Sequence, residues 1–114
     1  MHHKDLEAWK KSIELVKDVY SITKNFPSNE QFGLVSQMRR AAVSIPSNLA
    51  EGAARFSDKE SIRFIEISLG SLAELETQII IAKELNFIKE NQVLLEKIKT
   101  VSALLIGLRK YLNK

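Results

Sequence analysis

Residues 37–57 read QMRRAAVSIPSNLAEGAARFS, with a proline, Pro46, near the middle of the stretch. A proline in a helix interior removes one backbone hydrogen bond and costs about 3 kcal/mol. The apolar positions nevertheless keep helical spacing on both sides of it. They are Leu34, Met38, Ala41, Ile45, Leu49, Gly52 and Phe56. This spacing predicts one continuous helix over residues 29–55 that is kinked, and not broken, at Pro46.

The first and last quarters of the chain also have helical spacing. Residues 5–25 carry two adjacent apolar stripes, one of Leu6, Trp9, Ile13, Val16 and Tyr20, the other of Ala8, Leu15, Val19, Ile22 and Phe26. Asp5 is a candidate N-cap for this helix, and Pro27 ends it, because proline disfavours the helical conformation in the residue before it. The fourth helix is predicted over residues 89–112, with a seam typical of a left-handed bundle. The seam is Leu94, Ile98, Val101, Leu105, Leu108 and Leu112.

Capping patterns place the remaining helix ends. Ser28 with Gln31, and Ser57 with Glu60, have the spacing of a capping box and are expected to start helices 29–55 and 58–86. Asn86 is suited to the left-handed conformation that closes a helix. Short loops between long helices favour antiparallel neighbours. We therefore predict one all-α domain over residues 1–114, an antiparallel up-down-up-down four-helix bundle.

Composition narrows the possible functions. The chain has no cysteine, which excludes disulfides and thiol catalysis and fits a cytoplasmic protein. Its apolar runs are too short to span a membrane, so no membrane partner is expected. His2 and His3 are assigned no structural role, and no other histidine is present to bind a metal or activate a serine. We therefore expect no enzymatic activity, no metal and no cofactor.

A polar stripe runs beside the apolar stripe of helix 29–55. If helices 29–55 and 58–86 form a hairpin that turns at Ser57, facing residue numbers sum to about 114, which places Arg40 opposite Glu74. The same register predicts a structural polar network that fixes how the two helices pack. Its members are Gln37, Arg40, Ser44, Asn48, Glu51, Arg63, Glu66 and Glu74. The alternative is that Arg39, Arg40 and Arg55 reach solvent and contact phosphate.

Helix 58–86 has apolar residues around much of its circumference, more than a surface helix of a monomeric bundle needs. We therefore expect self-association, with Phe64, Ile67, Ile80 and Ile81 as interface candidates. Residues 57–86 hold six acidic and three basic side chains, whereas residues 87–114 hold six basic and two acidic. These unlike charges fit either neighbouring helices or neighbouring subunits.

The sequence resembles the four-helix-bundle proteins encoded in intervening sequences of bacterial 23S ribosomal RNA genes. The resemblance covers nearly the whole chain and is most specific in FGLVSQMRRAAVSIPSNLAEGAAR, residues 32–55, and in SLGSLAELETQIIIAKELNFI, residues 68–88. One departure is Asn86, where the family commonly has glycine. The chain is also similar to accessory proteins of diversity-generating retroelements. The resemblance implies a ring-shaped homopentamer.

Two functions fit these observations. The first is an oligomer that binds RNA or DNA, since five copies of a chain with net charge +3 carry about +15 around one ring. Candidate contacts are Lys10, Lys11, Lys17, Arg39, Arg40, Arg55, Lys97, Lys99, Arg109, Lys110 and Lys114. The second is a protein-interaction scaffold, or an accessory subunit for a protein encoded nearby, such as a reverse transcriptase.

Overall fold

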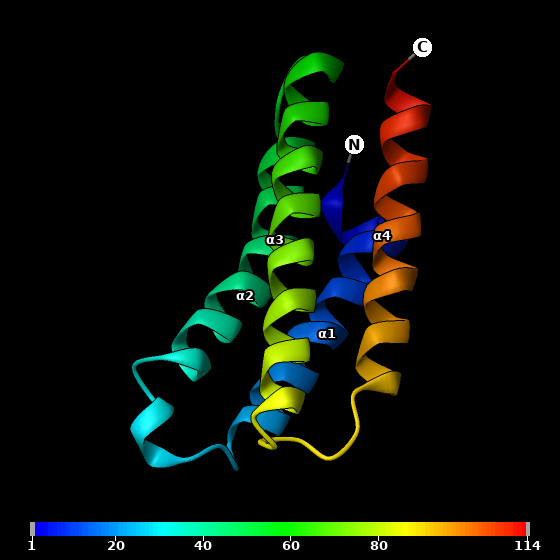
Figure 1. Ribbon diagram of the computed structural model, residues 1–114. Helices are drawn as coiled ribbons and strands as arrows, with labels where there is room; N and C mark the ends of the chain where they lie inside the picture. Colours follow the sequence, from blue (N-terminus) through cyan, green and yellow to red (C-terminus); the bar gives the residue numbers. More distant parts are fainter. Residues whose placement is uncertain (1, 114) are drawn as a thin grey trace.

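Four α-helices make up most of the protein, as the computed structural model of residues 2–113 shows (Figure 1). They are α1 (Glu7–Thr23), α2 (Leu34–Ala53), α3 (Asp58–Glu84) and α4 (Gln92–Leu112). Two 3-10 turns, η1 (His3–Asp5) and η2 (Ser28–Glu30), precede α1 and α2, and residues 2–113 contain no strand. The predicted all-α bundle of four helices is confirmed.

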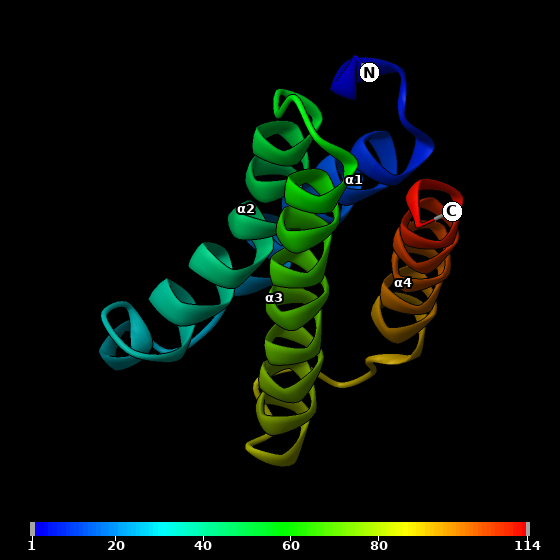
Figure 2. The ribbon, with the colours of Figure 1, turned by 90° about the horizontal axis from the view of Figure 1, so that it is seen from above.

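The helices alternate in direction. In Figure 1, where colours follow the sequence, the chain runs down α1, up α2, down α3 and up α4. Hydrogen bonds between α2 and α3 agree with opposite helix directions, because a later residue of α3 bonds to an earlier residue of α2. Ser61 donates to the carbonyl of Gly52, and Ser68 donates to the carbonyl of Ile45, farther back along α2. Figures 1 and 2 both show α2 diverging from α3 toward the N-terminal end of α2.

The core lies on the predicted apolar stripes. On α2, Met38, Ala41, Ile45 and Leu49 are buried, and α2 continues through Pro46 as the spacing predicts. The bend at Pro46 stays a prediction. On α4 the seam residues Leu94, Ile98, Val101 and Leu105 are buried. On α1, by contrast, the stripe that begins at Ala8 is the buried one.

Phe56 is the exception on the α2 stripe. The sequence places it one turn beyond Gly52 on the apolar face, but α2 ends at Ala53, before that turn is completed. The Phe56 side chain lies in the connection to α3 and is fully exposed.

The first two helices begin later than predicted. Asp5 lies in η1 and does not cap α1, whose N-cap residue is Leu6, without a side-chain hydrogen bond. His3, to which no role was assigned, packs edge-on against Trp9 with ring centroids 5.3 Å apart. Ser28 begins the short η2 turn and not α2. Glu30 supplies the cap of α2 instead, since its Oε1 accepts a hydrogen bond from the Leu34 amide at 3.1 Å.

The ends of α3 agree closely with the sequence. Ser57 caps this helix by accepting a hydrogen bond from the Glu60 amide at 3.2 Å, as the capping box predicts. Asn86 has a φ of 62°, the left-handed conformation expected there. The fourth helix begins at Gln92, three residues later than predicted. The Glu90 carboxylate accepts hydrogen bonds from the amides of Gln92 and Val93, which marks that start.

Gly52 sets how closely α2 and α3 approach. A Cβ atom at this position would lie 2.9 Å from Cβ of Phe64 and 3.2 Å from the carbonyl oxygen of Ser61. Only glycine leaves room for this contact. Gly70, the glycine of α3, has open space where a Cβ would be. Packing within the protomer therefore requires glycine at position 52 and not at position 70.

Candidate nucleic-acid interface

About half of the predicted cationic contacts have carboxylate partners. Lys114 lies outside the described residues. The paired side chains are Lys10 with Glu7 at 3.6 Å, Lys11 with Glu14 at 3.5 Å, Arg55 with Glu51 at 3.5 Å, Lys97 with Asp18 at 2.5 Å and Arg109 with Glu66 at 3.8 Å. The Asp18 hydrogen bond raises the pKa of Lys97 above its ordinary value of 10.5, and burial opposes this only in part. Charges neutralised in this way contribute less to phosphate binding.

Five candidates have no ion pair within residues 2–113. They are Lys17, Arg39, Arg40, Lys99 and Lys110. Lys99 and Lys110 are exposed on α4. Lys17 is exposed on α1, one helical turn before Tyr20. The remaining two, Arg39 and Arg40, are consecutive on α2 and lie on a different surface from the two lysines of α4.

Arg39 is held in one orientation by α1. Its guanidinium carbon lies 4.5 Å from the centroid of the Tyr20 ring, the geometry of a cation–π contact. Its Nε donates to Oγ1 of Thr23 at 2.9 Å. Thr23 is buried and donates in turn to the Val19 carbonyl at 2.7 Å. The cation is therefore positioned without a carboxylate to neutralise it.

Arg39 and Arg40 both line a hollow of about 550 Å³ between α1 and α2. We call this the α1–α2 hollow. Its lining residues are Tyr20, Gln31, Phe32, Val35, Ser36, Arg39, Arg40, Val43 and Ser44, all in the described part of the chain, and none is Asp or Glu. Its volume falls within the range of ligand sites, roughly 300–1,000 Å³. The lining thus combines two cations, two aromatic rings and several hydroxyl or amide groups.

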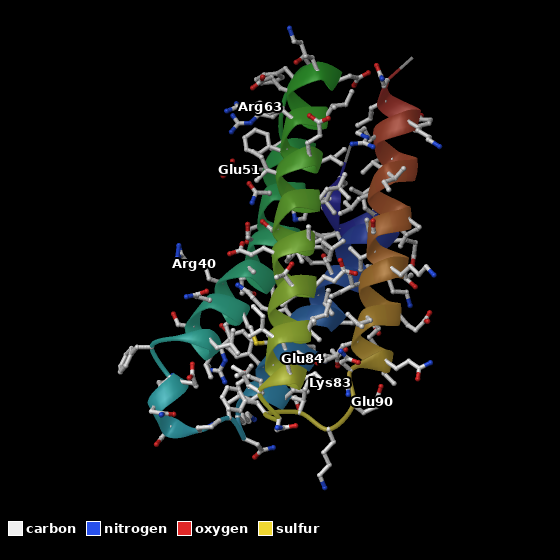
Figure 3. All side chains as sticks on the ribbon, in the orientation of Figure 1. Arg40, Glu51, Arg63, Lys83, Glu84 and Glu90 are labelled. Atoms are coloured by element: carbon white, nitrogen blue, oxygen red, sulfur yellow. The ribbon has the colours of Figure 1, made fainter. Side chains whose placement is uncertain are left out.

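Arg40 does not form the ion pair that the register predicts. It is exposed and projects from α2 away from the other helices in Figure 3. Arg40 and Glu74 do line one small pocket, so the register is right, but no ion pair within 4.0 Å joins them in the described chain. Glu74 accepts a hydrogen bond from Gln78 at 3.4 Å instead.

Hydroxyl groups form the contacts between α2 and α3 that the charged network was expected to make. The Oγ atoms of Ser44 and Ser71 are 2.8 Å apart, which is within one residue of the register in which facing residue numbers sum to about 114. Asn48 donates to the carbonyl and Oγ of Ser44. The charged members point elsewhere. Glu51 pairs with Arg55, Glu66 pairs with Arg109, the Arg63 guanidinium lies over Phe64, and Gln37 is exposed beside Arg40.

A second groove lies between α1 and α4 and has a volume of about 480 Å³. We call it the α1–α4 groove. Its lining includes Glu14, Glu90 and Glu96 as well as two lysines, so it is a poor site for phosphate. Within residues 2–113 no group of three or more His, Cys, Asp or Glu side chains is placed to hold a metal ion. None of the helices in that range combines the length and apolar character that crossing a membrane requires.

Residues 4–107 match the family of 23S rRNA-intervening sequence proteins, a match that covers most of the chain. The chain belongs to this family. A search of curated proteins finds no match.

The part of the chain that matches the 23S rRNA-intervening sequence protein family contains every residue of the α1–α2 hollow. Arg109 and Lys110, in the last turns of α4, lie beyond it. Of the interface candidates on α3, Phe64 is buried in the protomer, where its Cβ packs close to Gly52. Ile67, Ile80 and Ile81 remain 40–45% exposed.

The residues of this 23S rRNA-intervening sequence protein do not, from their spacing alone, identify the two aromatic members of the hollow. Tyr20 was assigned to an apolar stripe, but it is 40% exposed and lies under Arg39. A register signal was available, since Tyr20 and Arg39 lie about equally far from the turn between their helices. Phe32 is 97% exposed in the turn before α2, and nothing in its spacing indicates this.

Proposed function

We propose that the protein is a non-enzymatic oligomer, a homopentameric ring, that binds the phosphate backbone of RNA or DNA at the α1–α2 hollow. The observation that carries the proposal is that Arg39 and Arg40 line a hollow without any acidic lining residue. Unneutralised cations release counterions from nucleic acid when they contact phosphate, and this release supplies most of the affinity in sequence-independent binding.

The neighbouring surface on α1 supports the same function. Lys17 and Lys24 are exposed and lie about one turn to either side of Tyr20. Acidic side chains around this surface are engaged elsewhere, because Glu30 accepts from the first amide of α2 and Asp18 pairs with Lys97. Glu74, which shares a small pocket with Arg40, accepts a hydrogen bond from Gln78. A strand of phosphates can therefore follow this surface from α1 to Arg40 with little repulsion.

Self-association is supported by the outer face of α3. Ile67, Ile80 and Ile81 are exposed there. A ring forms when one face of a subunit meets a different face of the next. The acidic composition of α3 and the basic composition of α4 provide two such unlike faces. The number five rests on the family resemblance.

Light scattering tests the assembly, and a mass of one chain in solution would contradict it. Retention on heparin, or anisotropy of a labelled RNA measured across salt, tests the binding. The double variant Arg39→Gln/Arg40→Gln is expected to bind at least tenfold more weakly, with a salt slope reduced by about 1–2. The double variant Lys99→Gln/Lys110→Gln removes the same charge from α4 and is expected to bind nearly as wild type. Absence of wild-type binding at low salt would overturn the proposal.

A protein partner on the α1–α4 groove is the second candidate function. The groove carries both signs of charge, and Val93 at its edge is 60% exposed. Mixed charges around an apolar contact are typical of protein surfaces that bind protein. Coexpression with the product of an adjacent gene tests this candidate. A stable complex that is lost in Val93→Glu supports it, and failure to copurify excludes that partner.

A further inference from the structure

Phe32 is an aromatic side chain that the protomer leaves in water. Its ring is 97% exposed in the turn between η2 and α2. That segment, drawn in cyan in Figure 1, projects beyond the end of α2 and away from α3. A phenylalanine ring gains most of its stabilising effect from burial, so full exposure has no folding benefit. The position of Phe32 at the rim of the α1–α2 hollow gives the ring a possible partner.

The hollow offers two aromatic surfaces of different kinds. Tyr20 is covered on one side by the Arg39 guanidinium, which lies 4.5 Å from its ring centroid. Phe32 has no ring or cation stacked on it within residues 2–113. A planar, uncharged group can therefore stack on Phe32 while an anionic group beside it meets Arg39 or Arg40.

A nucleotide in a single strand has both of these parts. Unpaired bases expose their faces and stack on aromatic side chains, whereas the bases of a duplex are stacked on one another and their faces are not accessible to a side chain. Charge alone would bind either form. An exposed ring beside two unpaired arginines favours the single-stranded form.

We infer that the α1–α2 hollow selects single-stranded polynucleotide, with one base stacked on Phe32 and an adjacent phosphate bound by Arg40. The inference rests on the proposed function, since it specifies which nucleic acid the same site binds. It assigns Phe32 to selectivity and Arg40 to electrostatic affinity.

The test measures fluorescence anisotropy with labelled oligo(U), oligo(dT) and a mixed-sequence duplex of equal length. Phe32→Ala is expected to weaken binding of both single strands about tenfold and to leave duplex binding and the salt slope unchanged. Arg40→Gln is expected to weaken all three and to reduce the salt slope by about one. The two single strands together show whether the 2′-hydroxyl adds to the shared stacking and phosphate contacts.

Phe56→Ala is the matched control. Phe56 is also fully exposed, at the other end of α2, but Arg55 beside it is paired with Glu51. Its removal is expected to leave all three affinities unchanged. Equal single-strand affinities of Phe32→Ala and wild type would overturn the inference while leaving phosphate binding intact. A lower oligomeric mass of Phe32→Ala by light scattering would also overturn it, because the ring would then be seated in another copy of the chain. No binding of wild type to any probe would instead refute the proposed function.

Discussion

Gly52→Ala is expected to lower the free energy of unfolding by about 1–3 kcal/mol. The added Cβ would meet Cβ of Phe64 at 2.9 Å and the Ser61 carbonyl oxygen at 3.2 Å. Neither atom can move away by a side-chain rotation, so the backbone of α3 would have to shift. Overpacking of this kind costs about 1–3 kcal/mol. Separating the helices also stretches the buried 2.7 Å hydrogen bond from Ser61 to the Gly52 carbonyl, which contributes about 1 kcal/mol. The higher helix propensity of alanine offsets about 1 kcal/mol of this cost.

Gly70→Ala and Gly107→Ala are the matched controls. Both glycines lie within helices and have open space where a Cβ would be. Each replacement is expected to raise the free energy of unfolding by about 0.5–1 kcal/mol, because alanine restricts the unfolded chain and favours helix. Urea unfolding followed by far-ultraviolet circular dichroism measures all three variants. A single protein concentration is needed, since the stability of an oligomer depends on concentration.

The change in unfolding free energy is expected to have opposite signs for Gly52→Ala and for the two controls. A Gly52→Ala protein as stable as Gly70→Ala would refute the close contact of α2 and α3 near the turn. The unfolding free energies of Gly52→Ala and of either control are expected to differ by about 1.5–4 kcal/mol. This corresponds to a difference in melting temperature of roughly 6–16 °C for a chain of this size. Such a difference is easily resolved.

Three further variants test other contacts. Glu74→Ala is expected to change the free energy of unfolding by less than about 0.5 kcal/mol, since Glu74 is exposed and has no ion pair within residues 2–113. Ser68→Ala, in contrast, removes a buried 2.9 Å hydrogen bond to the Ile45 carbonyl and is expected to cost about 1 kcal/mol. Lys97→Met is expected to cost at most about 1 kcal/mol, because the pair with Asp18 is partly exposed. Since Asp18 raises the pKa of Lys97, this stabilisation is complete below about pH 10.5 and disappears as pH rises through the raised pKa, which unfolding measured across alkaline pH can follow. Ile81→Glu is expected to reduce the oligomeric mass in light scattering without loss of helix content, because this side chain is 42% exposed in the protomer; an unchanged mass would remove Ile81 from the interface.

The sequence predicts the bundle well because its apolar spacing is regular. Met38, Ala41 and Ile45 precede Pro46 and Leu49 follows it, on one face, and all are buried. The local preference of proline predicts a break in this helix, whereas the apolar spacing on both sides of Pro46 predicts a continuous one. Asn86 was likewise predictable, since few residues other than glycine tolerate a φ of 62°.

Helix starts were less predictable than helix existence. Ser28 has a valid capping-box spacing, yet η2 forms there. The helix α2 begins at Leu34, five residues later than expected, and Glu30 accepts a hydrogen bond from its first amide. Competing caps a few residues apart differ by about 1 kcal/mol or less, so tertiary packing decides between them. The burial of Phe26 against Phe87 at the same end of the bundle is one such tertiary contact.

The register between α2 and α3 could be predicted, but the ion pairs could not. Facing residues were placed to within one helical turn, about 5.4 Å, and this uncertainty exceeds the reach of a salt bridge. Arg40 and Glu74 accordingly share a pocket without forming an ion pair in the described chain. The exposure of Phe32 and Phe56 was also inaccessible, because it depends on which residue begins or ends α2.

Arg39 and Arg40 of α2 differ from Arg55, which follows the end of this helix, because α2 is packed differently at its two ends. Near the turn, Gly52 lets α3 come close, and Arg55 there is engaged by Glu51 and by the Phe64 ring at 4.8 Å. Toward the other end α2 diverges from α3, as Figure 2 shows, and no carboxylate of α3 forms an ion pair with Arg39 or Arg40 in the described chain. Arg39 is then fixed by the aromatic and hydroxyl groups of α1, which orient its charge without cancelling it. A polar stripe of uniform appearance in the sequence thus becomes an inter-helix contact at one end and an unneutralised cationic hollow at the other, which is where an anionic ligand would gain most from binding.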